Sequence, residues 1–239
     1  MQFSSAASSH VGQVRDENQD AFLVRDDVGL YVVADGMGGH QGGQTASRLA
    51  VQAVGDSFAA ALSQTDPAAM LQSAIHAACA AVFEAASQDP ALQGMGTTLT
   101  TLWVQGAKAF VGHVGDSRCY LVRQGQIAQI TDDHSLVNEQ IKLGLMTPEE
   151  ARDSHLKNII TRSVGFERSV AVDVFEVDLE PNDRLLLCSD GLTNLVDDQE
   201  ICHALWTLPL QAVPQHLIDS ANANGGDDNI TVVCVLAKT

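Results

Sequence analysis

Residues 30–43, LYVVADGMGGHQGG, constrain the fold of this chain more than any other stretch. Strand-forming side chains run from Leu30 to Ala34, and Asp35 follows at once, before a glycine-rich turn and a long helical pattern. A carboxylate at the end of a buried strand is unfavourable unless it is paired with a positive charge or binds a cation. The fold that contains this strand therefore has to bring a positive charge to Asp35.

Other runs of strand-forming residues also carry Asp at one end. Asp116 follows the run 110–115, Asp190 follows the run 185–189, and Asp228 comes just before the run 230–236. The chain has no excess of basic residues to neutralise them. Because carboxylate oxygens are the ligands that Mg²⁺ and Mn²⁺ prefer, we expect Asp35, Asp190 and Asp228 to meet around such ions.

If these carboxylates converge, their mutual repulsion demands counter-ions. Two ions bridged by one carboxylate and a water would generate a hydroxide at neutral pH and would hold a phosphoryl group for in-line attack. Gly36 has no side chain, so its carbonyl oxygen can approach a metal closely. The guanidinium of Arg15 can hold two phosphate oxygens in a fork.

The overall charge narrows the partners that the chain can bind. The 239 residues carry 13 Lys and Arg against 30 Asp and Glu, a formal net charge of −17. Nucleic acids and anionic membranes require clustered Lys and Arg, so neither is an expected partner. Solubility alone could explain much of this acidity. The 45% hydrophobic content supports a sizeable core, and the length suits one large domain or two small ones.

The cysteines and the N-terminal sequence indicate a cytoplasmic protein. The 5 cysteines include no C-x-x-C pair, and most stand in apolar runs, which is typical of buried thiols in a reducing compartment. The opening MQFSSAASSH lacks the basic and apolar regions of a secretory signal. No apolar stretch is expected to approach the roughly 20 residues that a membrane-spanning helix needs.

The order of the elements predicts an α+β fold with two antiparallel sheets flanked by helix pairs, because strands and helices come in blocks. Residues 132–168 are polar and mostly helical in pattern, and they predict a flap insertion rather than a second domain. Successive strand signals at 97–104, 109–114, 117–122 and 126–130 indicate a meander of hairpins. An edge strand is expected at 2–11, and other strands at 21–24, 30–34, 170–177, 184–188 and 230–236. Helices are expected at 44–62, from Pro67 with Asp66 as its cap to near 90, after Asp198 through Leu208, and at 213–223.

Eight short motifs follow one another along nearly the whole chain. They are Arg15-x-x-Asn18-x-Asp20, Asp35-Gly36-Met37-Gly38-Gly39, Gly96-Thr97-Thr98, Gly115-Asp116-Ser117-Arg118, Asp133-His134-Ser135, Thr161-Arg162-x-x-Gly165, Ser189-Asp190-Gly191 and Asp228-Asn229-x-Thr231. Each one alone is weak, since Asp-Gly is usually a turn. The ordered set resembles the metal-dependent Ser/Thr protein phosphatases of type 2C in their bacterial form.

This resemblance implies a four-layer α-β-β-α sandwich, formed as a single catalytic domain over residues 1–239. It also implies a dinuclear Mn²⁺ or Mg²⁺ site in a cleft at one end of the sandwich, with the flap beside it. At the matching positions, Asp35 would bridge the two metals and the Gly36 carbonyl would bind one of them. Asp190 and Asp228 would hold the other.

The remaining site residues follow from the same resemblance. Asp20 would act mostly through metal-bound water, Arg15 would bind the substrate phosphate, and Asp116 would be a ligand of a possible third, weaker metal. The implied activity is hydrolysis of phosphoprotein monoesters by a hydroxide that bridges the two metals. The expected partners are phosphorylated Ser/Thr proteins, including a Ser/Thr kinase or its substrates, and the chain is expected to be a monomer.

Two positions depart from the family pattern. Gln19 stands where many members have Glu, and Met37 stands where animal members have a His thought to protonate the leaving group. His40 is the nearby candidate for that acid, although a solvated loop His or a helix cap is the favoured reading, and a metal-bound water could serve instead. Asp116 could also be a turn residue that pairs with Arg118.

Other readings remain open. Asp133-His134-Ser135 suggests a catalytic triad, but adjacent residues do not reach one another in triad geometry, so helix capping is favoured. A catalytically weak module that binds phosphoproteins would share the fold, although the expected metal ligands are all present. A different two-metal hydrolase, such as a nuclease, is disfavoured by the lack of basic clusters.

Overall fold

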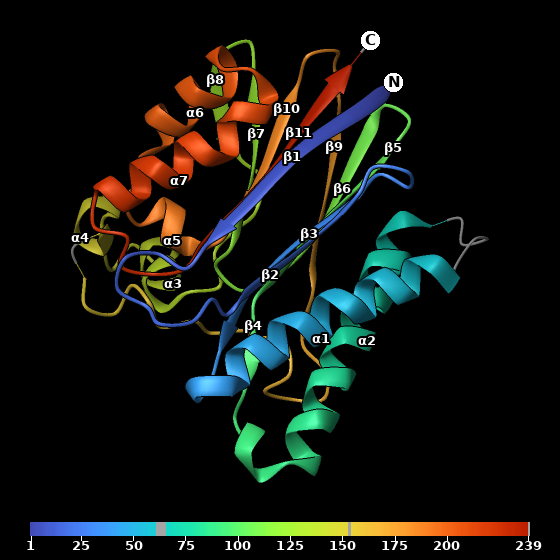
Figure 1. Cartoon of the computed structure of the whole chain (residues 1–239), viewed down its shortest axis with the longest axis vertical. Coiled ribbons are helices and arrows are strands. Elements are labelled where there is room, and N and C mark those ends of the chain that lie inside the picture. The colour runs from blue at the N-terminus through green and yellow to red at the C-terminus, as the bar shows by residue number, and fades with distance from the viewer. Residues whose placement is uncertain (61–65, 153, 239) are drawn as a thin grey trace.

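The computed structural model describes residues 1–60, 66–152 and 154–238, without the side chains of His40, Ala60 and Arg152. Two antiparallel sheets lie face to face, and helices cover the outer face of each (Figure 1). The predicted α+β sandwich of four layers is therefore confirmed. The end of the helix expected over 44–62 lies outside the described residues.

The first sheet has the strand order β2-β3-β5-β6-β9, with the short β4 paired to the end of β3. Helices α1 and α2 cover its outer face, where apolar side chains of α1 and α2 pack against those of β3. Asp66 caps α2 through the N–H of Ala68, as the sequence predicts. The bounds are β2 Asp20–Arg25, β3 Leu30–Met37, α1 Gly39–Ala60, α2 Pro67–Gln88, β4 Gly96–Thr97, β5 Leu99–Gln105, β6 Lys108–Val114 and β9 Asp173–Asp178.

The second sheet has the order β1-β11-β10-β7-β8, which places β1 at an edge as expected. Its outer face packs against α6 and α7, while the short α5 directly follows β10. The bounds are β1 Gln2–His10, β7 Arg118–Arg123, β8 Gln126–Gln129, β10 Arg184–Cys188, α5 Asp190–Thr193, α6 Asp198–Thr207, α7 Val213–Ala223 and β11 Ile230–Lys238. Short 3-10 turns, Pro90–Leu92 and Leu210–Ala212, follow α2 and precede α7.

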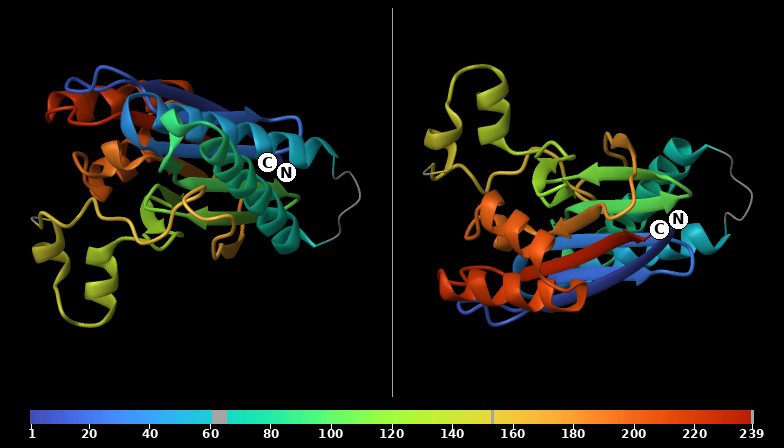
Figure 2. Two further views of the ribbon diagram at one scale, coloured as in Figure 1. Left: turned by 90° about the horizontal axis from the view of Figure 1, so that it is seen from below. Right: turned by 90° about the horizontal axis from the view of Figure 1, so that it is seen from above.

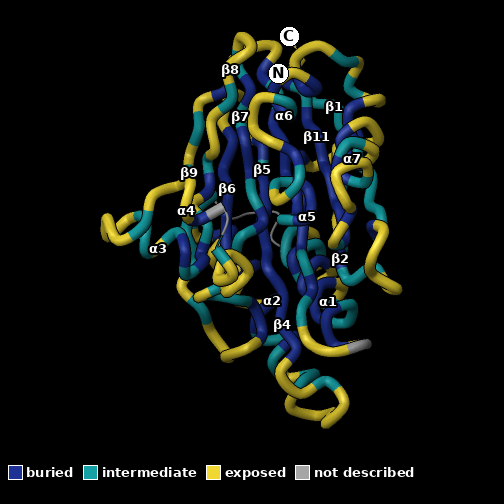
Figure 3. Tube along the Cα trace, turned by 90° about the vertical axis from the view of Figure 1, so that its left-hand side faces the viewer, coloured by how far each residue is buried: buried dark blue, intermediate teal, exposed yellow. Residues whose placement is uncertain are grey.

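The core between the sheets is formed by the side chains that point inward from both. Tyr31 and Val33 of β3 face Leu185 and Leu187 of β10 there, whereas Leu30 and Val32 point to the helix side. This alternation is the period of a strand whose two faces are both covered. The central strands are buried along most of their length, whereas the edge strands β1, β2, β8 and β9 are only partly buried (Figure 3).

The predicted meander over residues 97–130 is wrong in one respect. β5 and β6 form one hairpin in the first sheet, and β7 and β8 form another in the second. The turn at 115–117 carries the chain from one sheet to the other, so Asp116 lies between the two sheets. The sequence pattern could not show which sheet each hairpin joins, because apolar and polar side chains alternate in the same way in both hairpins.

Residues 132–168, the flap segment, project to one side of the sandwich (Figure 2). The segment contains α3, Leu136–Lys142, and α4, Pro148–Arg152. Thr147 and Glu150 form a capping box, in which Glu150 accepts from the N–H of Thr147 at 2.8 Å and Thr147 Oγ1 accepts from the N–H of Glu150 at 3.2 Å. Much of the segment is irregular, so it is less helical than predicted.

All five cysteines are buried and free, as the sequence indicates. By length and composition, α2 is apolar enough to cross a membrane, so the expectation that no apolar stretch approaches that length is wrong. Its buried residues pack on the first sheet, as those of a core helix do.

Candidate metal centre

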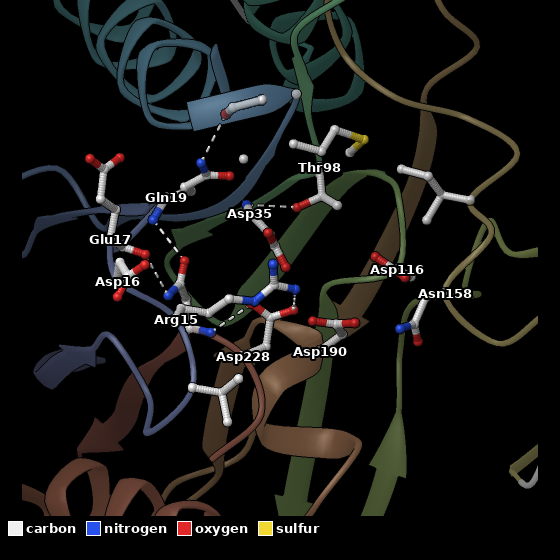
Figure 4. Close-up of a pocket in the computed structure, with 17 residues that line it drawn as sticks. Arg15, Asp16, Glu17, Gln19, Asp35, Thr98, Asp116, Asn158, Asp190 and Asp228 are labelled. Carbon is white, nitrogen blue, oxygen red and sulfur yellow. Dashed lines mark hydrogen bonds and ion pairs between the residues drawn. The ribbon is translucent and has the colours of Figure 1, made fainter. Parts of the chain in front are cut away.

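A cleft of about 550 Å³ opens where β3 and β10 end and β11 begins. Asp35, Asp190 and Asp228 line it, together with Asp116 on the turn between the sheets (Figure 4). Arg15 is the only basic side chain that the structure describes in this lining. The structure thus brings together the carboxylates that the sequence singled out, and their roles as metal ligands stay predictions.

The backbone of Asp35 is held by neighbouring threonines. The N–H of Asp35 donates to Thr98 Oγ1 at 2.9 Å, and its carbonyl oxygen accepts from Thr97 Oγ1 at 2.8 Å. Asp20 of β2 lies directly opposite Asp35 in the strand pairing. The hairpin of β2 and β3 therefore fixes two of the predicted residues as one unit.

Gly36 lies where no other residue fits without a shift of the backbone. A Cβ at this position would stand 2.0 Å from the carbonyl oxygen of Gly43 and 2.6 Å from that of Gln19. The close approach of β3 to the start of α1 therefore requires glycine here. Gly36 also lines the cleft, which is compatible with the predicted role of its carbonyl oxygen.

Asp190 is the first residue of α5, directly after β10. Its Oδ2 accepts from Asn194 Nδ2 at 2.9 Å, and its Oδ1 is buried without a hydrogen-bond partner. A Cβ on the next residue, Gly191, would stand 2.0 Å from the carbonyl oxygen of Asn229. This tight packing sets Asp190 beside Asp228.

Arg15 and Asp228 form an ion pair across the cleft, with 2.8 Å between Nη2 and Oδ2. Asn229 holds the loop that carries Arg15. Its Oδ1 accepts from the N–H of Gln19 at 2.7 Å, and its Nδ2 donates to the carbonyl of Glu17 at 3.0 Å. The motif Asp228-Asn229-x-Thr231 contains Asn229 but does not by itself predict this role, and its place beside Asp228 is the only local signal for it.

Asp20 is buried behind the cleft. Its Oδ2 accepts from Ser189 Oγ at 2.8 Å and from Thr231 Oγ1 at 2.6 Å, while its Oδ1 is buried without a partner. Burial raises the pKa of Asp20 from 3.8 to about 7, with smaller upward contributions from the negative charges of Asp190 and Asp228.

The other carboxylates show the same electrostatic pattern. Burial, followed by the negative charges of Asp20 and Asp190, holds the pKa of Asp35 well above its ordinary value. Burial and the charge of Asp190 raise the pKa of Asp116 to about 8. Each shift reports a surplus of negative charge in a poorly solvated space, which a bound cation would relieve.

The donor set fits hard divalent cations. The described carboxylates of the cluster offer oxygen ligands, and Oδ1 of Asp20 and of Asp190 are buried polar atoms that lack partners. Within the described ranges, no three acidic, His or Cys side chains are already placed to hold a metal ion. The carboxylates would therefore have to rotate toward bound ions, and Asp228 would have to leave Arg15.

Asp116 does not pair with Arg118, contrary to the alternative reading. Arg118 instead forms a two-pronged ion pair with Asp133, with 2.6 Å between Nη2 and Oδ2. The turn that carries Asp116 is held by a 2.8 Å hydrogen bond between Thr98 Oγ1 and Ser117 Oγ. Asp116 is thereby left facing the cleft.

Asp133, His134 and Ser135 do not form a triad. Ser135 caps α3 through the N–H of Asn138 at 3.3 Å, as the favoured reading predicted. His134 Nδ1 accepts from the N–H of Gly115 at 3.0 Å, and its Nε2 lies 3.1 Å from Asp173 Oδ2. The sequence reading missed this link between the flap segment, the Asp116 turn and β9.

The structure gives a role to one of the two departures from the family pattern, Gln19, and leaves the other untested. Gln19 Nε2 donates to the carbonyl of Gly39 at 3.1 Å, so the residue ties β2 to the start of α1. The side chain of His40 lies outside the described residues. Its predicted alternatives therefore both stay predictions.

Comparison with known proteins gives one consistent result. A family model described as Protein phosphatase 2C matches residues 8–227. The chain is 39% identical over 233 residues to "Serine/threonine phosphatase stp" of Listeria innocua, which covers 94% of this chain and 92% of that protein. It is 40% identical over 236 residues to "Protein phosphatase PhpP" of Streptococcus pneumoniae, covering 94% of each.

Solved structures agree with the sequence comparison. The Mycobacterium tuberculosis serine/threonine phosphatase PstP/Ppp superposes with a TM-score of 0.94 at 35% identity, and the match covers 100% of both chains. A structure of the PstP catalytic domain "in complex with 2 Manganese ions" has a TM-score of 0.90 at 35% identity, with 99% of each chain covered.

Proposed function

This chain belongs to the protein phosphatase 2C family of serine/threonine phosphatases, and we propose that it hydrolyses phosphoprotein monoesters by direct attack of a hydroxide held between two divalent metal ions. When bound, the ions would supply Lewis-acid charge for the phosphoryl group and an activated water. Mn²⁺ or Mg²⁺ would suit the oxygen ligands, with a possible third ion at Asp116. The manganese in the PstP structure supports the dinuclear assignment.

One observation carries the proposal above the others. Asp35, Asp190 and Asp228, which are far apart in sequence, line one cleft, and Oδ1 of Asp190 is buried there without a partner. A purely structural carboxylate would have acquired a protein hydrogen-bond donor in this position. Asp20, which has a second unpartnered oxygen, would orient water next to the cluster.

Arg15 is placed to bind the substrate phosphate. Its side chain is 56% exposed, and its guanidinium lies at the cleft against Asp228. A guanidinium can donate two parallel hydrogen bonds to phosphate oxygens, which fixes the orientation of the phosphoryl group. Because the pair with Asp228 is partly solvated, phosphate can replace the carboxylate at little cost.

No phosphoenzyme is needed in this scheme. All five cysteines are buried, and burial raises the pKa of Cys188 to about 12, so they are poor nucleophiles. The described lining of the cleft contains no His. We therefore assign the proton that the leaving Ser or Thr oxygen takes up to water, with His40 as the alternative.

The cellular setting is part of the same proposal. Residues 1–239 would form one catalytic domain with the flap segment, and the protein would act as a cytoplasmic monomer. Its substrates would be the proteins phosphorylated by a Ser/Thr kinase, or that kinase itself. The acidic net charge of −17 supports protein substrates over nucleic acids or anionic membranes.

Phosphate release from a phosphothreonine peptide and from p-nitrophenyl phosphate tests the activity. We expect turnover of both with Mn²⁺, none with EDTA, and a loss of at least about 100-fold for Asp190→Asn, since one of the few metal ligands is removed. Asp219→Asn, an exposed carboxylate on α7, is the matched control and should retain wild-type rates.

The rival functions give different results in the same experiment. A catalytically weak binding module would bind the phosphopeptide without releasing phosphate. A nuclease would cleave bis-p-nitrophenyl phosphate or DNA in preference to the monoester. Either result would contradict the proposed function.

A further inference from the structure

A second cavity adjoins the metal cleft. It measures about 610 Å³ and lies between the inner side of the flap segment and residues 193–198, which join α5 to α6. We call it the under-flap groove. Its walls include Val137, Ile141 and Lys157 on the flap side and Leu195, Asp197 and Asp198 on the other.

The under-flap groove and the metal cleft meet at the catalytic carboxylates. Asp116 and Asp190 line both cavities. A polypeptide whose phosphorylated side chain reaches the cleft can therefore continue into the groove on one side of the phosphorylated residue. The groove is wide enough for several side chains and combines apolar walls with charged ones.

Some charged side chains in the groove are already paired within the protein, and others are not. Arg118 is neutralised by its two-pronged pair with Asp133 and is not available to a ligand. Asp197 and Asp198 are exposed, and no Lys or Arg in the described part of the chain forms an ion pair with either. Lys157 stands on the opposite, flap-side wall.

Both free carboxylates are held in place by the fold. Asp197 Oδ1 accepts from the N–H of Glu200 at 2.8 Å, and Asp198 Oδ1 accepts from the hydroxyl of Tyr120 at 3.1 Å. Helix capping thus accounts for one oxygen of Asp197, and the Tyr120 bond for one oxygen of Asp198. Their second oxygens can receive a cationic side chain.

We propose that the under-flap groove binds the substrate chain beside the phosphorylated residue, and that Asp197 and Asp198 select substrates with Lys or Arg in that segment. The inference rests on the proposed phosphatase function. It names the substrate class as phosphoproteins with a basic residue flanking the phosphorylation site. The basic side chain would enter on the α6 side, because Lys157 repels it from the flap side.

A set of phosphothreonine peptides tests this selection. The peptides carry Lys at each flanking position in turn, and the matched peptides carry Gln. We expect wild-type kcat/KM to favour Lys by about two- to fivefold at positions that reach the groove, the size typical of an exposed ion pair. Raising the NaCl concentration to about 1 M should shrink the preference, because salt screens exposed charges.

Variants test whether the carboxylates of Asp197 and Asp198 cause the preference for Lys peptides. Asp197→Asn and Asp198→Asn should each reduce the Lys-to-Gln ratio, and the double variant should abolish it, since Asn can still cap α6. Asp198→Lys should favour a Glu peptide instead. Asp219→Asn removes an exposed charge from α7 and should keep the wild-type ratio. Thermal unfolding confirms that each variant is folded.

The possible failures are distinguishable. If wild type hydrolyses p-nitrophenyl phosphate and the Gln peptides but shows no preference for Lys, the groove assignment is wrong and the phosphatase function stands. A wild-type ratio retained in the double variant also overturns the assignment. If none of the substrates is hydrolysed with Mn²⁺, the proposed function itself fails.

Discussion

The stability of the metal-free protein should fall as the pH rises, and Asp20 shows why. Burial raises its pKa in the folded protein to about 7, against 3.8 for an ordinary Asp. Between these two values the folded state holds a proton that the unfolded state has released, so folding becomes less favourable with each pH unit. The penalty is absent below about pH 4 and complete above about pH 7.

The magnitude follows from the gap between the two pKa values. One pH unit corresponds to about 1.4 kcal/mol, so the full penalty for Asp20 is about 4 kcal/mol. Of this, about 3 kcal/mol develops between pH 5 and pH 8. For a chain of this length 1 kcal/mol shifts Tm by about 2–4 °C, so Asp20 alone should lower Tm by about 6–12 °C over that interval.

Thermal unfolding in EDTA, followed by circular dichroism from pH 5 to pH 8, measures this fall. The net charge of −17 also favours unfolding at high pH. Asp20→Asn therefore provides the comparison, because Asn can still accept from Ser189 and Thr231 but does not titrate. The variant should lose about 3 kcal/mol of the pH dependence, whereas Asp219→Asn should keep it. Equal slopes for wild type and Asp20→Asn would refute the reasoning.

Three further results are expected. Mn²⁺ should raise the Tm of wild type, more at pH 8 than at pH 5, and Asp190→Asn should erase the rise. A wild-type melting curve unchanged by Mn²⁺ would count against the site. Arg15→Ala should lower kcat/KM for phosphopeptides by about 10- to 100-fold through loss of charged hydrogen bonds, and an unchanged value would remove Arg15 from phosphate binding. His134→Ala should destabilise the fold by about 1–3 kcal/mol in urea unfolding, because the N–H of Gly115 loses its acceptor. His134→Asn should recover part of this stability. Equal stability of both variants would exclude that hydrogen bond as the cause.

The sequence predicted the parts of the site that are local. Asp35 and Asp190 stand where an apolar run meets a glycine, and that pattern marks a strand end without any knowledge of the fold. The helices of the outer layers were predicted for similar reasons, since Asp66 and Pro67 signal a helix start within two residues. Local chemistry of this kind requires no long-range information.

The parts that the sequence missed depend on distant contacts. Asn229 bridges to the loop near Glu17, and His134 reaches Asp173 across 39 positions of the chain. The transfer of the chain between sheets at residues 115–117 depends on which strands pair, and alternation within each strand does not contain that information. Helix α5 is four residues long, too short for any helical periodicity.

The central claim is that Asp35, Asp190 and Asp228 hold a pair of divalent ions. Anomalous diffraction at the manganese edge, from crystals grown with Mn²⁺, locates such ions without reference to activity. We predict two strong peaks in the cleft between these three side chains, with Arg15 turned away from Asp228. A cleft without anomalous density at saturating Mn²⁺, or peaks only at surface carboxylates, would contradict the claim.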